Sequence, residues 1–319
     1  MLKQIKEKLA YCGDTVLITN TANETNRDQI LADKVFEGKP VLNLQLHSEI
    51  MAHEILTYLD GRVRKIYIDV EQKQPMNLFH LAQTICLQTT VYPLKANDMT
   101  VLATDNIILE HFNKNVYQKQ IVILGNGNLA FKIMLQMVER GATVSMLGRN
   151  LAKSQRLVEA VNEINFAHTD NKAIAVSELP ERIDCFISAI SAKQQVTSEQ
   201  VENLAIEGLV LDVGIGNFRP EAMKQLLANK IAFYRVDIQA ALPSFMAEST
   251  RFFSEIRGVR TIDGTSFIAG GIVGQAGDVI VDNVHAPKQI LGIADGLGGV
   301  SDMASNQALY RKLESWGNK

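Results

Sequence analysis

The residues best suited to chemistry form a glycine-rich turn, Gly125-Asn126-Gly127-Asn128-Leu129-Ala130, directly after the apolar residues 121–124. The pattern G-x-G-x-x-[GA] between a strand and a helix is typical of dinucleotide binding. Gly125 allows a tight turn, Gly127 lets backbone N–H groups approach a pyrophosphate, and Ala130 lets the helix lie close to the strand. An anion is favoured at such a helix N-terminus. The turn therefore predicts a nucleotide site, the alternative being a tight turn that binds nothing.

The end of the next strand, residues 143–147, indicates which nucleotide is bound. An NAD-binding unit usually has an acidic residue here that holds the ribose 2′-OH. This chain instead has Gly148-Arg149-Asn150, followed by Lys153. Arg149 and Lys153 favour NADP(H), with NAD(H) possible as a second choice. The alternative is that Arg149 is a solvated arginine at the start of a helix.

Two later strands also end in small residues. The strand at residues 184–188 ends at Ser188 and is followed by Ala189 and residues 190–191. The strand at residues 209–213 ends at Val213 and is followed by Gly214 and residues 215–217. In a doubly wound sheet the ligand lies beyond the carboxyl ends of the strands. Three such ends in register predict room for the nicotinamide arm of a cofactor.

Alternating strands and helices indicate an α/β protein with a small N-terminal α/β domain, a doubly wound Rossmann domain and a C-terminal helix that packs back. The expected boundaries are 1–116, 117–299 and 300–319. We expect a helix near residues 29–36, a helix that opens at residues 103–106, a last sheet strand at residues 259–262, and a helix from residue 270 toward residue 284.

Composition excludes several classes of protein. The chain has 319 residues, is 46% hydrophobic and 21% charged, and carries a net charge of −3. These values fit a globular protein and offer no basic field for nucleic acid. No stretch predicts a signal peptide or a membrane span, so we expect a cytoplasmic protein without a membrane partner. Cys12, Cys86 and Cys185 are odd in number and widely spaced, which argues against a disulfide framework or a zinc site, and we expect no metal.

The arrangement resembles the shikimate/quinate dehydrogenase group of the wider amino-acid-dehydrogenase-like superfamily. Val91-Tyr92-Pro93-Leu94-Lys95 resembles the family segment V-T-x-P-x-K, and Ala103-Thr104-Asp105-Asn106 resembles N-T-D-G. The glycine turn and Gly148-Arg149-Asn150 resemble the family's cofactor motifs. The spacing from Lys95 to Asp105 is much shorter than in the family, so the family's substrate is not carried over.

The resemblance implies a role for three residues. Lys95 and Asp105 would be catalytic and would exchange the proton that accompanies hydride transfer, while Gln275 would contact the substrate. Asp212 and Asp237 are second-rank candidates for the same cleft. The alternative for Asp105, together with Thr104, is a helix cap.

The sequence therefore predicts an NADP(H)-dependent oxidoreductase that acts on a small polar metabolite, a hydroxy acid or ketone, between two domains. An imine or amino-acid reductase of similar architecture is an alternative. A protein that senses a nucleotide or binds a partner without catalysis is another. By analogy with relatives of this architecture, we expect a homodimer as a possible assembly.

Overall fold

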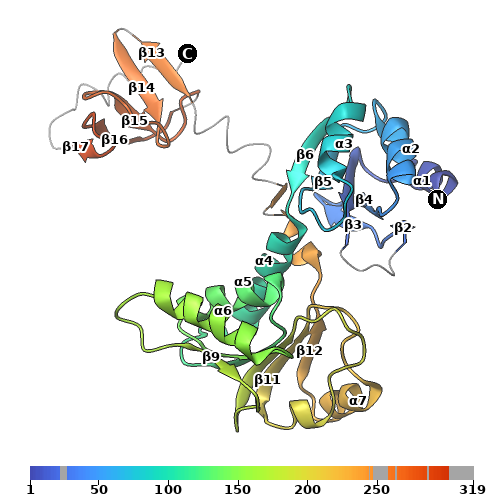
Figure 1. The fold of residues 1–319 in the computed structure, drawn as a ribbon. Coiled ribbons are helices and arrows are strands. Elements are labelled where there is room, and N and C mark those ends of the chain that lie inside the picture. The colour runs from blue at the N-terminus through green and yellow to red at the C-terminus, as the bar shows by residue number, and fades with distance from the viewer. Residues whose placement is uncertain (22–26, 244, 247–257, 263, 286, 302–319) are drawn as a thin grey trace. The chain divides into compact units, whose positions relative to one another are not determined.

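The computed structural model describes residues 1–21, 27–243, 245–246, 258–262, 264–285 and 287–301. The chain divides into two compact units, Met1–Pro243 and Ser244–Lys319. Within the first unit, a first lobe (residues 1–95) and a second lobe (residues 96–243) each contain a sheet of their own. Figure 1 shows that helix α4 leads from one lobe into the other.

The first lobe is built on a sheet of six strands in the order β2-β4-β1-β5-β6, with β3 pairing β4. Strands β4, β1, β5 and β6 run parallel, so their carboxyl ends meet at one edge. The strands are β1 (Thr15–Thr19), β2 (Gln29–Ile30), β3 (Lys34–Phe36), β4 (Lys39–Gln45), β5 (Lys65–Asp69) and β6 (Thr90–Leu94). The helices are α1 (Leu2–Leu9), α2 (Glu49–Leu59) and α3 (Leu78–Ile85).

The helix expected near residues 29–36 is wrong, because this segment forms β2 and β3, both antiparallel to β4. Phe36 pairs with Lys39, so only Glu37 and Gly38 connect β3 to β4. Both have positive φ, 50° and 74°. A two-residue turn with two left-handed residues matches the twist of antiparallel strands. The Glu-Gly pair was the signal of this hairpin.

The second lobe has the strand order of a Rossmann fold, which confirms the expected fold class. Its six parallel strands lie in the order β12-β11-β10-β7-β8-β9, which, numbered along the chain and read from β9, is 3-2-1-4-5-6. They are β7 (Gln120–Leu124), β8 (Thr143–Leu147), β9 (Ala173–Val176), β10 (Ile183–Ser188), β11 (Leu204–Asp212) and β12 (Ala232–Arg235). The order reverses between β7 and β10, where ligands bind in such sheets.

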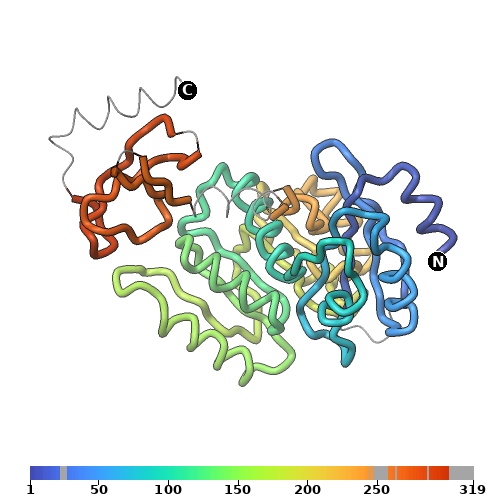
Figure 2. Tube along the Cα trace, turned by 90° about the horizontal axis from the view of Figure 1, so that it is seen from above, coloured from blue at the N-terminus to red at the C-terminus, as the bar shows by residue number. Residues whose placement is uncertain are grey.

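Helices cover this sheet on both faces. They are α4 (Ala96–His111), α5 (Asn128–Glu139), α6 (Leu151–Ile164) and α7 (Pro220–Ala228), with the short helices η1 (Glu199–Val201) and η2 (Ile238–Ala240). Helices α5 and α6 lie side by side, as Figures 1 and 2 show. Helix α7 packs through Ala222 and Leu226 against Val122, Phe186 and Val210. Apolar burial on both faces explains why these strands are almost continuously hydrophobic.

The second unit contains a five-stranded sheet in the order β13-β14-β15-β16-β17. The strands are β13 (Val259–Ile262), β14 (Thr265–Ala269), β15 (Val279–Val281), β16 (Ile290–Ala294) and β17 (Val300–Ser301). Only β14 and β15 pair in parallel. A small core of residues on β14 to β16, together with Val284, holds the sheet together.

Two expectations for this region are wrong. Residues 259–262 do not end the Rossmann sheet, which ends with β12, but pair antiparallel with β14. The helix expected from residue 270 toward 284 is replaced by a turn, in which Gly277 has a φ of 97°, and by β15. Val279 and Val281 are buried and Ile280 less so, which is the alternation of a strand.

The expected domain boundaries can be compared with this division. The second compact unit begins at Ser244, whereas the expected Rossmann domain runs from residue 117 to residue 299, and the expected boundaries stay a prediction. Residues 302–319, where the C-terminal helix was expected, lie outside the described residues. Among the described helices, none has the length and apolar character needed to cross a membrane.

Candidate functional site

The glycine turn after β7 has the geometry that its pattern predicts. Gly125 has a φ of 127°, and a β-carbon on it would lie 2.7 Å from the carbonyl oxygen of Ala189. Gly127 is the N-cap of α5, and a β-carbon there would meet nothing within 4 Å. Ala130 is fully buried. One glycine is thus required by the fold, whereas the other leaves open space at the start of the helix.

The first turn of α5 is suited to an anion. Gly127 provides no side-chain cap, so the N–H groups at the helix start keep their capacity to bind an acceptor. The Asn126 amide donates to the Asn150 carbonyl and to Ser154 Oγ, both at 3.2 Å, which fixes the turn against the start of α6. Open space, unpaired N–H groups and the helix dipole together fit a bound pyrophosphate.

The start of α6 lies beside this turn. Asn150 caps the helix by accepting the N–H of Lys153 at 2.9 Å. Arg149 and Lys153 are exposed, and within the described part of the chain neither forms an ion pair. No carboxylate occurs between Gly148 and Lys153. Two available cations at the end of β8 fit a ribose phosphate better than a ribose hydroxyl.

The ends of β10 and β11 come together as expected. The carbonyl of Ser188 accepts the N–H groups of Val213 and Gly214, at 2.9 and 3.2 Å. The buried Ser188 hydroxyl donates to Asn217 Oδ1 at 2.8 Å. A β-carbon on Gly214 would lie 1.8 Å from the Ile190 carbonyl oxygen, so only glycine fits. Ser188, Val213 and Gly214 therefore contribute to the crevice mainly through their backbone atoms.

The structure does not bring Lys95 and Asp105 together. Helix α4 begins at Ala96 and not at residues 103–106, so Lys95 and Asp105, ten positions apart, are separated by about 15 Å along one helix. Lys95 is 57% exposed and pairs with Asp98 at 2.7 Å, a hydrogen bond that raises the pKa of the lysine. Asp105 is 3% exposed and accepts two hydrogen bonds of 2.6 Å from Arg140.

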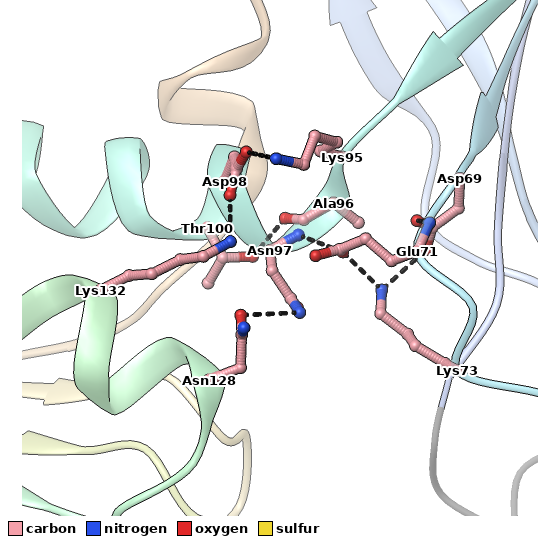
Figure 3. Close-up of polar contacts among 10 residues, drawn as sticks. All are labelled: Asp69, Glu71, Lys73, Lys95, Ala96, Asn97, Asp98, Thr100, Asn128 and Lys132. Carbon is pink, nitrogen blue, oxygen red and sulfur yellow. Dashed lines mark hydrogen bonds and ion pairs between the residues drawn. The ribbon is translucent and has the colours of Figure 1, made fainter. Parts of the chain in front are cut away.

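A different lysine is paired with buried carboxylates at the end of β5 (Figure 3). Lys73 Nζ lies 2.7 Å from Asp69 Oδ2 and 3.0 Å from Glu71 Oε2. The side chains of Asp69, Glu71 and Lys73 are 0%, 14% and 17% exposed. Burial raises the pKa of Asp69, against the opposing effect of Lys73. The sequence signal was an aspartate at a strand end with a lysine four residues later.

A cleft of about 890 Å³ lies between the two lobes. From the first lobe it is lined by Thr19, Thr21, Lys34, Asn43 and Gln45, and from the second by Thr100, Ser191, Lys193, Val213, Gly214, Arg235 and Asp237, among others. The backbone carbonyl of Thr21 accepts a hydrogen bond from Gln74, the residue after Lys73. Lys73 therefore lies on a loop that is attached to the wall of the cleft.

The buried oxygen atoms that lack partners among the described residues include one on Asn43, which lines the cleft, and one on Asp212, next to the lining residue Val213. Asn43 donates through Nδ2 to the Ala32 carbonyl at 3.1 Å, but its Oδ1 accepts no hydrogen bond. Asp212 Oδ2 accepts the N–H groups of Gly216 and Asn217, while its Oδ1 has no donor. A buried acceptor without a donor costs stability. Asn43 on the cleft wall can therefore accept a hydroxyl or N–H group of a ligand.

Asp237, a second-rank candidate, belongs to a contact between the lobes that we name the clasp, formed by Lys34, Val35, Asp237 and Gln239. Lys34 Nζ lies 2.6 and 2.8 Å from the two oxygens of Asp237. The Gln239 amide accepts the N–H of Val35 and donates to its carbonyl, both at 2.8 Å. Partial burial acts to raise the pKa of Asp237, but the hydrogen bonds from Lys34 and Gln239 outweigh it, and the pKa is lowered.

Gln275 belongs to the second unit. It is exposed, and its backbone N–H donates to Asp278 Oδ2 at 2.8 Å within a turn. Its contact with substrate therefore stays a prediction. The residues that sequence reasoning missed are Asp69, Glu71 and Lys73, together with Asn43.

Comparison with known proteins agrees with the resemblance seen in the sequence. Residues 107–237, less than half of the chain, match the family Shikimate / quinate 5-dehydrogenase. The matched stretch contains the glycine turn and the Rossmann sheet, so a distant relationship to this family is confirmed for the second lobe. No curated protein sequence matches the chain.

Solved structures give a weaker likeness. A shikimate dehydrogenase in complex with NADP⁺ is 11% identical, covering 73% of this chain and 88% of that chain with a TM-score of 0.44. The 5-ketofructose reductase of Gluconobacter sp. strain CHM43 is 14% identical, covering 80% and 96% with a TM-score of 0.42. The dipicolinate synthase A chain from Bacillus subtilis is 16% identical, covering 74% and 78% with a TM-score of 0.38. Because these sequence identities and TM-scores are low, the fold of this chain is assigned from its own strand order.

Proposed function

We propose that the protein is an NADP(H)-dependent oxidoreductase that transfers a hydride to or from a small polar metabolite in the cleft between the lobes. One observation carries the proposal: the uncapped start of α5, with open space over Gly127, lies at the reversal point of a 3-2-1-4-5-6 sheet. The match of residues 107–237 to a dehydrogenase family supports the same class of reaction.

The preference for NADP(H) is proposed from the end of β8. Arg149 and Lys153 are exposed cations without ion pairs among the described residues, and no carboxylate between them would hold a ribose hydroxyl. The pyrophosphate would be held by the N–H groups at residues 127–130. Ser188, Ala189, Val213 and Gly214 would line the crevice on its other side.

The proton is proposed to be handled by Lys73, in place of Lys95. A bound nicotinamide would supply or accept the hydride. Lys73, held by Asp69, would donate or accept the proton at the substrate oxygen of a ketone or hydroxy acid. In an imine or amino acid, the alternative substrates, the proton would move at nitrogen. Asn43 Oδ1, Lys193 and Arg235 offer an acceptor and two cations for the polar groups of the substrate.

Titration with NADPH and NADH, followed by fluorescence, tests the proposed cofactor. We expect NADPH to bind more tightly than NADH, and Arg149→Asp to abolish or reverse that preference. Arg156→Asp is the matched control, because it makes the same charge change at an exposed position further along α6. Equal effects of the two variants, or a wild-type preference for NADH, would remove Arg149 from the site.

Turnover separates the enzyme from a nucleotide-sensing protein. Small hydroxy acids, ketones, imines and amino acids are offered with NADP(H), and formation or loss of the reduced nicotinamide is followed. Turnover of one of these substrates supports the enzyme. Tight nucleotide binding with no turnover across all four classes supports the non-catalytic alternative.

A further inference from the structure

Glu71 joins two structural elements through a single carboxylate oxygen. Its Oε2 lies 3.0 Å from Lys73 Nζ and also accepts the backbone N–H of Asn97 at 2.8 Å. Asn97 lies in the first turn of α4, whose N-cap residue Lys95 offers no side-chain cap. Glu71 therefore caps α4 from a loop of the first lobe while it holds the ammonium group of Lys73.

The same turn of α4 reaches the start of α5 (Figure 3). Asn97 Nδ2 donates to Asn128 Oδ1 at 3.4 Å, and Asn128 is the first residue of α5. Asp98 accepts a hydrogen bond from Lys132, one turn further along α5. A continuous set of contacts thus runs from Lys73 through Glu71 and Asn97 to the glycine turn.

We propose that Glu71 is a positioning residue for Lys73 and that, through Asn97, it links the orientation of this lysine to the nucleotide turn. Asp69 alone would hold Lys73 at one point, whereas the second carboxylate fixes the direction of the ammonium group. The inference rests on the proposed function for its catalytic meaning. The placement of Lys73 by Glu71 is a property of the protein without nucleotide.

The two roles of Glu71 can be separated by substitution. Glu71→Gln keeps an oxygen that can accept the Asn97 N–H, but it removes the negative charge that holds Lys73. Glu71→Ala removes both contacts. Glu54→Gln, at an exposed position on α2, is the control for loss of one carboxylate.

The first readout is acetylation of Lys73 by limiting acetic anhydride in protein without nucleotide, measured by peptide mass spectrometry against the exposed Lys224 on α7 as an internal reference. If Glu71 holds the ammonium group, labelling of Lys73 rises several-fold in both Glu71 variants and stays at the wild-type level in Glu54→Gln. Wild-type labelling in Glu71→Gln would overturn the proposal and leave Glu71 as a cap of α4 only.

The second readout is the effect of NADPH on the same labelling. Saturating NADPH is expected to change Lys73 labelling in the wild type and to have little effect in Glu71→Ala. An equal change in both proteins would overturn the link between lysine and turn. If NADPH fails to bind the wild type, the proposed function fails, whereas the first readout still decides whether Glu71 positions Lys73.

Discussion

At the residue scale, the two glycines of the turn have different tasks. Gly125 has a backbone conformation that side chains rarely adopt and a carbonyl against its open side, so Gly125→Ala is expected to lower stability by about 1–3 kcal/mol. Gly127→Ala meets open space at a φ of −93°, and because alanine is a poorer N-cap than glycine it is expected to cost no more than about 1 kcal/mol. Thermal unfolding of both variants measures the difference, and equal losses would contradict the described geometry.

Lys73 and Lys95 offer a second comparison between similar residues. Lys73→Met is expected to lower kcat by roughly 10²–10⁴-fold, the range for a lost general acid or base, with nucleotide affinity retained. Lys95→Met removes an exposed ammonium group and is expected to retain kcat within a few-fold. Steady-state kinetics on the substrate found by screening provides the measurement. A large loss of kcat in Lys95→Met and a small one in Lys73→Met would return the catalytic role to Lys95.

The glycine turn could be read from sequence because its chemistry is local. Gly125, Gly127 and Ala130 each meet a requirement set by the adjoining strand and helix. The positions of Lys95 and Asp105 could not be predicted in the same way. Lys95 and Asp105 looked like neighbours only on the assumption that a new helix opened at residue 103, whereas Lys95 is the N-cap of α4 and Asp105 lies well inside that helix.

At the scale of elements, the start of α4 explains that error. Its N-cap residue is Lys95, which has no side-chain acceptor, and the acceptor comes from Glu71 in another loop. A cap supplied by a distant residue leaves no local signal, whereas Thr104 and Asp105 have the side chains of good caps inside the helix. Asp105 is instead used to pack α4 on α5.

The Asp105–Arg140 pair yields the prediction for this scale. Arg140→Ala leaves the buried carboxylate of Asp105 without its partner and is expected to cost about 3–5 kcal/mol. The double variant Asp105→Asn with Arg140→Met removes both charges and is expected to cost clearly less. Denaturant unfolding of the single and double variants supplies the test. Equal stability losses would show that the charges do not act as a pair.

At the scale of the whole molecule, the doubly wound fold class could be predicted from the sequence, but the edge strand of the sheet and the contacts between the lobes could not. Alternating strands and helices and one glycine turn predict a Rossmann sheet, because parallel connections are right-handed and ligands bind at the reversal point. The clasp joins residues 203 positions apart in the chain, Lys34 and Asp237, and no periodicity signals such a contact. The β-sheet of the second unit was missed because its glycine turns were interpreted as a helix start. A homodimer and a cytoplasmic location stay predictions.

The clasp predicts a pH dependence. Because the pKa of Asp237 is lowered in the folded protein, its contribution is present at neutral pH and is lost as the pH falls below the ordinary aspartate value of about 3.9. Asp237 is 40% exposed, so we expect Asp237→Asn to cost only about 1 kcal/mol at neutral pH. The difference between wild type and variant in denaturant midpoint should shrink in acid. A difference in denaturant midpoint that grows in acid would contradict a lowered pKa of Asp237 in the folded protein.

The central claim is that the start of α5 binds the phosphates of a nicotinamide nucleotide. Fluorescence titration of the wild type and Gly127→Val with NADPH tests it most directly, because a β-carbon at Gly127 meets no other atom within 4 Å, whereas the valine side chain would occupy the place of the phosphates. We expect saturable NADPH binding by the wild type and none by Gly127→Val, with a cooperative thermal unfolding transition in both proteins. Absence of binding by the wild type, or equal binding by both, would contradict the claim.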